Sequence, residues 1–126
     1  MIIHLDTNFL VELVTVGSPG GLKILAWLKE GKSLTTSAIA WSEFCTGPLS
    51  KEQKEAAFTV LGRSIVDCTW REAEEAARLF NLTGRRRGSH ADCMIAAAAI
   101  VSGVPLATVN PADFQRMVAF GLMLEG

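Results

Sequence analysis

The amino-acid sequence predicts an α/β fold, in which a central parallel sheet of four or five strands lies between two layers of helices, a three-layer α/β/α arrangement. Short apolar runs that suit buried strands alternate along the chain with one or two helical patterns. The 126 residues are 49% hydrophobic and 20% charged, which is enough apolar material for one core. We therefore expect a single domain over residues 1–126.

The expected elements follow from apolar runs and from capping residues, glycines and prolines that mark where helices begin and end. Ser50 with Gln53 and Thr69 with Glu72 have the spacing of capping boxes. Strands are expected at residues 2–5, 33–36, 64–68, 106–109 and 120–124. Helices are expected at 9–16 with a Thr7 or Asn8 cap, from Leu22 to a stop at Gly31, from a Ser37 cap to just before Gly47, after Ser50, from a Thr69 cap to Gly84, from a Ser89 cap to Gly103, and at 111–117.

Composition excludes several classes of protein. The 3 cysteines lie far apart without a CxxC spacing, which argues against a disulfide framework and a thiolate zinc site and favours a reducing, cytoplasmic location. The net charge of −1 excludes a broadly cationic nucleic-acid binder. The apolar run at 93–101 is too short to cross a bilayer, and the N-terminal run has no basic segment before it. We expect neither a membrane anchor nor a signal peptide.

Four acidic residues lie just after predicted strands or in the first turns of predicted helices, the region where ligands bind in open α/β sheets. Asp6 ends the first strand, Glu43 lies in the helix after the second, Asp92 opens the alanine-rich helix, and Asp113 follows the strand at 106–109. Each also has a structural interpretation, as a helix cap, as the capping-box partner of Ser89, or as part of a solvated helix face. The acids that we assign to solvated faces are Glu52, Glu55, Glu72, Glu74 and Glu75.

If these four carboxylates converge, they cannot all stay ionised without a positive partner. No lysine occurs after Lys54 to balance them. Mg²⁺ or Mn²⁺ suits such an oxygen-rich shell, and this kind of site favours hydrolysis of phosphodiesters. Zinc is not expected, because His4 and His90 lack ligand spacing with each other or with a cysteine. A nucleotide binder is disfavoured by the absence of GxGxxG and GxxxxGK[ST] motifs. A phosphotransfer receiver domain is also disfavoured, because it would need a lysine late in the chain.

Four stretches of the chain resemble one known family: residues 5–13, 37–44, 92–97 and 103–114. The sequence resembles the PIN-domain ribonucleases, in particular the VapC-type toxins of bacterial and archaeal toxin–antitoxin pairs. The resemblance implies a PIN-like fold and a Mg²⁺- or Mn²⁺-dependent endoribonuclease that acts as the toxin of a type II toxin–antitoxin system. It implies an RNA substrate, a cognate antitoxin and a homodimer. The alternative is a catalytically inactive PIN-fold domain that binds RNA or a protein partner.

The resemblance also implies roles for individual residues. The catalytic, metal-binding acids would be Asp6, Glu43, Asp92 and Asp113, with Asn110 as the alternative to Asp113 in the fourth position. Polar support would come from Thr7, Asn8, Thr108 and Asn110, and Glu12 lies in the first matching motif as a rim charge or a solvated glutamate. Apart from the resemblance, the basic run Arg85, Arg86 and Arg87 is the one strong positive cluster of the sequence. Because it immediately precedes the helix of Asp92, it could contact RNA phosphates near the acids, and the alternative is a solvated loop.

Two apolar surfaces are expected to bind partners. The dimer surface would include Leu22, Leu25, Ala26 and Leu28, with Trp27 and Trp41 nearby. The tail of the antitoxin would lie in a groove formed by Phe9, Leu10, Leu13, Trp41 and Phe44, with a basic side chain at the acids. The alternative for these aromatic residues is burial in the core.

Overall fold

The structure is a computed structural model that describes residues 1–125. Its centre is a sheet of parallel strands in the order β3-β2-β1-β4, which confirms the predicted fold class with four strands. The strands are β1 (Ile2–Leu5), β2 (Ser33–Ser37), β3 (Ile65–Val66) and β4 (Leu106–Ala107).

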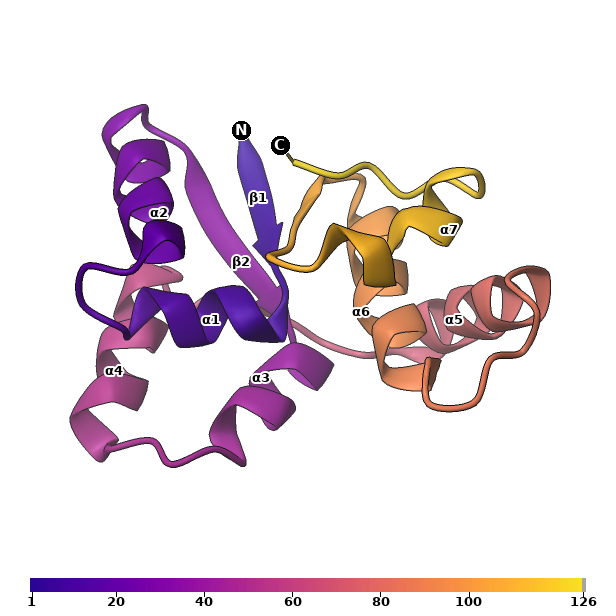
Figure 1. Cartoon of the computed structure of the whole chain (residues 1–126), viewed down its shortest axis with the longest axis horizontal. Helices are drawn as coiled ribbons and strands as arrows, with labels where there is room; N and C mark the ends of the chain where they lie inside the picture. The colour runs from indigo at the N-terminus through magenta and orange to yellow at the C-terminus, as the bar shows by residue number, and fades with distance from the viewer. Residues whose placement is uncertain (126) are drawn as a thin grey trace.

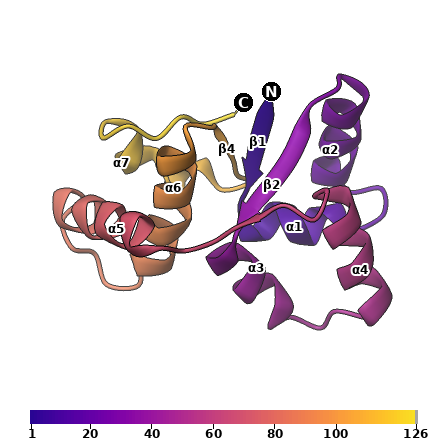
Figure 2. The same ribbon diagram turned by 180° about the vertical axis from the view of Figure 1, so that it is seen from behind.

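Helices cover both sides of the sheet (Figures 1 and 2). Helices α1, α2, α3 and α4 gather on one side of β1 and β2, and α5, α6 and α7 lie on the other. The helices are α1 (Thr7–Leu13), α2 (Pro19–Lys29), α3 (Ala38–Cys45), α4 (Lys51–Val60), α5 (Trp70–Leu82), α6 (His90–Ser102) and α7 (Gln115–Val118), with a 3₁₀ helix η1 (Pro111–Asp113).

The final predicted strand, at 120–124, is wrong. Phe120 and Gly121 use their amides in the turn that follows α7, donating to Met117 and Val118. Only the end of this segment reaches the sheet, where Leu124 forms an isolated parallel bridge with Leu106. The strands expected at 64–68 and 106–109 exist but are only 2 residues long.

The helix caps are partly as predicted. Both capping boxes form, at Ser50 with Gln53 and at Thr69 with Glu72. The expected caps of the first helix are wrong, because the Asp6 carboxylate accepts the hydrogen bond from the amide of Phe9. Two further corrections concern Glu72, which is buried rather than solvated, and Ser89, whose hydroxyl makes no cap of α6.

The core is built around β1 and α6. Alanines 96–99 are buried along α6, and their small side chains let this helix pack closely against its neighbours. His4 on β1 is fully buried, and burial lowers its pKa to about 4, so its imidazole is neutral. The chain's three cysteines are free thiols. Within residues 1–125, none of the helices is long and apolar enough to span a membrane.

Candidate active site

The four acids predicted from the sequence line one cavity of about 200 Å³. It lies at the carboxyl ends of β1 and β2, where α1, α3 and α6 come together (Figure 1). Its lining residues are Asp6, Thr7, Asn8, Glu43, Asp92, Ile95, Asp113 and Phe114. The parallel sheet thus collects acids from four separate segments of the chain at one edge.

Two of the acids come from the N-terminal part of the chain. Asp6 is the residue after β1 and is only 3% exposed. Its Oδ1 accepts a hydrogen bond of 2.9 Å from the Phe9 amide, so the carboxylate is fixed by the start of α1. Glu43 is exposed in the second turn of α3, and its Oε1 accepts a hydrogen bond of 2.6 Å from the hydroxyl of Thr7.

The other two acids come from the C-terminal part. Asp92 lies half-buried in the first turn of α6, and Asp113 ends η1 at the surface. Since the side chain of Ser89 donates to the carbonyl of Arg86 instead of capping α6, the expected capping box between Ser89 and Asp92 does not form. The carboxylate of Asp92 is therefore available to the cavity.

The electrostatics of the cavity disfavour a full set of negative charges. Burial, together with the carboxylates of Asp113, Glu43 and Asp6, raises the pKa of Asp92 to about 6. Burial also raises the pKa of Asp6, against hydrogen bonds from Thr108 and from the amides of Phe9 and Asn8 that lower it. A bound cation would relieve this repulsion.

The donor chemistry fits a hard divalent cation. The charged side chains that line the cavity are all carboxylates, and no imidazole or thiol is among them. Among residues 1–125, no three His, Cys, Asp or Glu side chains form a ready-made metal cluster. A cation held here would therefore complete its shell with water, as Mg²⁺ commonly does.

The residues expected as polar support divide into two groups. Thr7 and Asn8 line the cavity, and the side chain of Thr108 acts on the carboxylate of Asp6 by lowering its pKa. Asn110 is exposed, lies outside the cavity lining, and donates its backbone amide to the hydroxyl of Thr108 over 3.0 Å. The geometry thus favours Asp113 over Asn110 for the fourth position of the acidic site.

The three arginines expected near the site are also divided. Arg86 and Arg87 line a second cavity of about 170 Å³, together with Gly88, Ser89, Asp92 and Asp113. The guanidinium of Arg85 instead hydrogen-bonds the side chain of Asn81 and lies 5.4 Å from the centre of the Phe80 ring. The structure does not place Arg85 in either acidic cavity.

The family model described as PIN domain matches residues 3–119 of this chain. The chain belongs to the PIN domain family. No curated protein matches its sequence significantly.

Solved structures share the fold of this PIN domain over nearly its full length. VapBC2 from Rickettsia felis, bound to a DNA fragment from its promoter, has a TM-score of 0.75 at 23% identity, covering 99% of this chain and 98% of that one. VapBC-1 from nontypeable Haemophilus influenzae has a TM-score of 0.70 at 23% identity, with 99% and 97% covered. VapC20 from Mycobacterium tuberculosis, a Sarcin-Ricin loop cleaving toxin, has a TM-score of 0.64 at 17% identity, with 98% and 99% covered.

Sequence reasoning missed two residues of the PIN-domain cavity, Ile95 and Phe114. Both are almost fully buried. Ile95 lies three residues after Asp92, so the helical period places it on the same face of α6, and this spacing was the available signal. Phe114 directly follows Asp113 and also lines the cavity. The two apolar side chains form part of the cavity wall beside the carboxylates.

Both expected partner surfaces need correction. Phe9, Leu10 and Phe44 are core residues with at most 4% exposure, because α1 and α3 pack together and against the sheet. They cannot form an open groove. Trp27 is likewise buried, with its ring centre 5.5 Å from that of Phe9. Leu22, Leu25 and Leu28 are exposed as expected.

Glu12 is not a rim charge of the acidic cavity, because it lies outside the cavity lining. Its side chain packs against Gly20 of α2, where an added Cβ would come within 2.7 Å of its Cγ.

Proposed function

We propose that this PIN domain is a Mg²⁺- or Mn²⁺-dependent endoribonuclease. The observation that carries the proposal is the single cavity lined by Asp6, Glu43, Asp92 and Asp113, with no basic side chain in its lining. A divalent cation there would lower the pKa of a water molecule and stabilise the leaving oxygen of an in-line displacement at phosphorus.

The protein's own groups prepare this site in three ways. Asp6, Glu43, Asp92 and Asp113 would hold the cation and its water molecules. The Thr7 hydroxyl and the Phe9 amide fix the orientation of two of these carboxylates before anything binds. Ile95 and Phe114 supply an apolar wall beside the carboxylates, which lowers the polarity of their immediate surroundings.

We further propose that the nuclease is a toxin with a cognate antitoxin. The support is the shared fold with chains of VapBC complexes and with the Sarcin-Ricin loop cleaving toxin VapC20. The substrate would then be RNA, and the antitoxin would restrain cleavage. The alternative, a PIN domain that only binds RNA or a partner, is disfavoured because all four acids are present and lie together.

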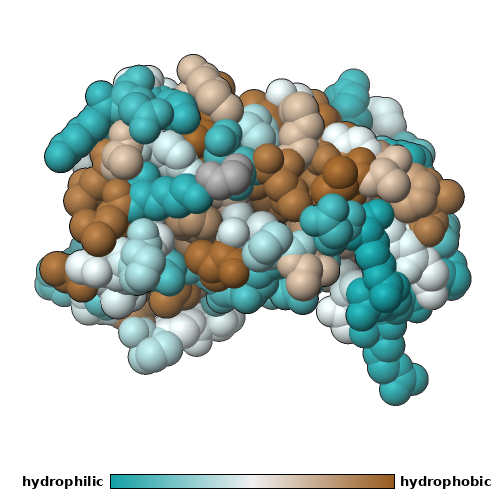
Figure 3. Space-filling view, turned by 45° about the horizontal axis from the view of Figure 1, so that its top comes forward, coloured by the Kyte–Doolittle hydropathy of each residue, from teal (hydrophilic) through white to brown (hydrophobic). Residues whose placement is uncertain are grey.

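A homodimer is proposed through the outer face of α2. Leu22 is 58% exposed and Leu25 is 54% exposed, and both line an apolar hollow of about 220 Å³. Figure 3 shows hydrophobic surface on the side of the molecule that carries α2. Sedimentation of the wild type as a dimer, and of Leu25→Glu as a folded monomer, would support this surface. A wild-type monomer at micromolar concentration would contradict it.

The activity is tested with purified protein and total bacterial RNA, followed by gel electrophoresis and by end-mapping of the products. Cleavage in Mg²⁺ or Mn²⁺ that stops with excess EDTA is expected. Asp6→Asn and Asp92→Asn should abolish cleavage while circular dichroism stays unchanged, because removing a repelled charge leaves the core intact. Full cleavage by either variant, or in EDTA, would overturn the proposal.

A further inference from the structure

The arginine-lined cavity is continuous in its lining with the acidic cavity. Asp92 and Asp113 belong to both. The loop that brings the arginines there connects α5 to α6, and it is shaped by a turn in which the amide and hydroxyl of Ser89 both donate to the carbonyl of Arg86, over 3.1 and 2.8 Å. Gly88 has a φ of +84°, which a side chain would disfavour.

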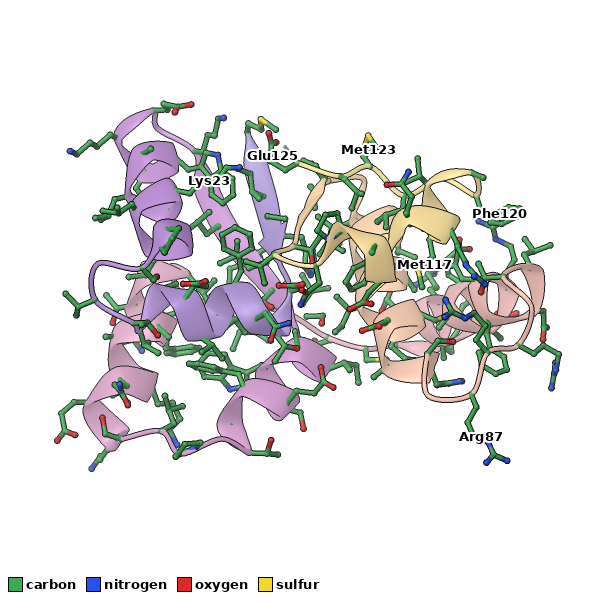
Figure 4. All side chains as sticks on the ribbon, in the orientation of Figure 1. Lys23, Arg87, Met117, Phe120, Met123 and Glu125 are labelled. Carbon is green, nitrogen blue, oxygen red and sulfur yellow. The ribbon has the colours of Figure 1, made fainter. Side chains whose placement is uncertain are left out.

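The charged groups of this loop differ in their surroundings. The guanidinium of Arg85 is occupied by Asn81 and Phe80 on the preceding helix. The guanidinium groups of Arg86 and Arg87 make no hydrogen bond or ion pair with other described residues. In Figure 4 the side chain of Arg87 extends from the loop into solvent. Two of the three cations are therefore free to bind an anion.

The acidic cavity alone repels a polyanion. A strand of RNA carries a negative charge on every phosphate, and a chain with a net charge of −1 offers no general attraction for it. Arg86 and Arg87 are the basic residues that line either of the two joined cavities. Because the two cavities share Asp92 and Asp113, a strand bound at the arginines would lie beside the carboxylates.

We propose that Arg86 and Arg87 form a phosphate-binding subsite for the RNA backbone beside the cleavage site, and that Arg85 does not take part. The inference rests on the proposed nuclease function. The guanidinium groups bind phosphate oxygens with paired N–H donors, which fixes the position of the strand along the cavity. The subsite binds any sequence, because its contacts are to phosphate and not to bases.

The test measures binding separately from cleavage. Each protein carries Asp6→Asn so that the probe, a fluorescein-labelled single-stranded RNA 12-mer of mixed sequence, stays intact in Ca²⁺. Fluorescence anisotropy is measured over a series of salt concentrations for the parent, for Arg86→Gln/Arg87→Gln and for Arg85→Gln. Arg85→Gln is the control, because it removes one positive charge from the same loop while leaving Arg86 and Arg87 in place. Thermal melting checks that all three are folded.

The double variant is expected to bind the probe at least about tenfold more weakly, and its slope of log affinity against log salt should fall by about 1.4, the value for two lost phosphate contacts on a single strand. Arg85→Gln should bind like the parent. Equal weakening by Arg85→Gln, an unchanged double variant, or a parent that does not bind the probe would each overturn the subsite. Failure of the nuclease proposal appears elsewhere, as absence of metal-dependent cleavage by the wild type.

Discussion

The hydroxyl of Thr7, in the first turn of α1, donates a hydrogen bond of 2.6 Å to Oε1 of Glu43 in the second turn of α3. This bond joins the segment that follows β1 to the segment that follows β2. Because Thr7 is also the neighbour of Asp6, one short stretch of backbone orients two of the four acids. The metal-binding geometry proposed here thus depends on a threonine that would itself bind no metal.

Replacing Thr7 by valine tests that dependence. Valine keeps the branched shape but removes the donor, so Glu43 loses its fixed orientation. We expect the rate of RNA cleavage to fall about tenfold, with a higher Mg²⁺ requirement, as is usual when a partner of a metal ligand is lost. Initial rates over a Mg²⁺ series measure this, and Thr7→Ser, which keeps the hydroxyl, should retain most of the activity. A valine variant with wild-type rates at every Mg²⁺ concentration would contradict it.

Asp6 has two separable roles, as helix cap and as proposed metal ligand. Asparagine caps a helix as well as aspartate does, whereas alanine does not. Asp6→Asn and Asp6→Ala should both be inactive. The alanine variant should be less stable than the asparagine variant by about 1 kcal/mol, or a melting temperature lower by about 4 °C. Equal melting temperatures would show that the bond to Phe9 does not stabilise α1.

Two substitutions distinguish Asp113 from Asn110 as the fourth residue of the proposed metal site. Asp113 lines both acidic cavities, whereas Asn110 lies outside them. We expect Asp113→Asn to reduce cleavage about a hundredfold, since it removes a charge from the metal shell. Asn110→Ala should cleave at close to the wild-type rate. The reverse order of the two rates, measured at saturating Mg²⁺, would assign the position to Asn110.

The capping box of α5 should make stability depend on pH. Hydrogen bonds from the amide and hydroxyl of Thr69 lower the pKa of Glu72 below 4.5 in the folded state. The ionised form therefore stabilises the fold above that pH, and this stabilisation is lost as the pH falls through the lowered pKa. We expect Glu72→Gln to destabilise the protein by about 1 kcal/mol at pH 7 and by less at pH 3.

Urea unfolding at the two pH values checks this, with Glu74→Gln as the control. Glu74 is exposed on the same helix. Its substitution should change stability little at either pH. A Glu72→Gln effect that is the same at pH 3 and pH 7 would show that charge at the cap contributes nothing.

The positions of the acids could be predicted because a simple rule of topology governs them. Parallel strands end at one edge of the sheet, so Asp6 and Glu43 had to lie near each other once β1 and β2 were recognised. Asp113 follows β4 and obeys the same rule, whereas Asp92 follows α5 and was found from its place in the first turn of α6. Two strong capping boxes were also readable, because their spacing is local.

What failed depended on packing between distant segments. The sequence of Phe9 and Phe44 shows their apolar character but not that α1 and α3 bury them against each other. The sequence of Arg85, Arg86 and Arg87 likewise shows three equal charges. Only the structure shows that the guanidinium of Arg85 contacts Asn81 and Phe80, one turn earlier on α5. Ser89 was expected to cap α6, but its hydroxyl donates to the carbonyl of Arg86 in the preceding turn instead.

The position of β1 in the sheet determines how much of the chain must be present before the fold can form. β1 is the first strand to be synthesised, yet it lies between β2 and β4, and its partner β4 begins only at Leu106. The cavity likewise combines distant segments, since it needs both Asp6 after β1 and Asp113 after β4. Contacts so distant in sequence form only when both segments are available. A chain truncated before Leu106 would therefore have neither a complete sheet nor a complete set of acids, so the proposed toxicity would require both β1 and the segment from β4 to η1.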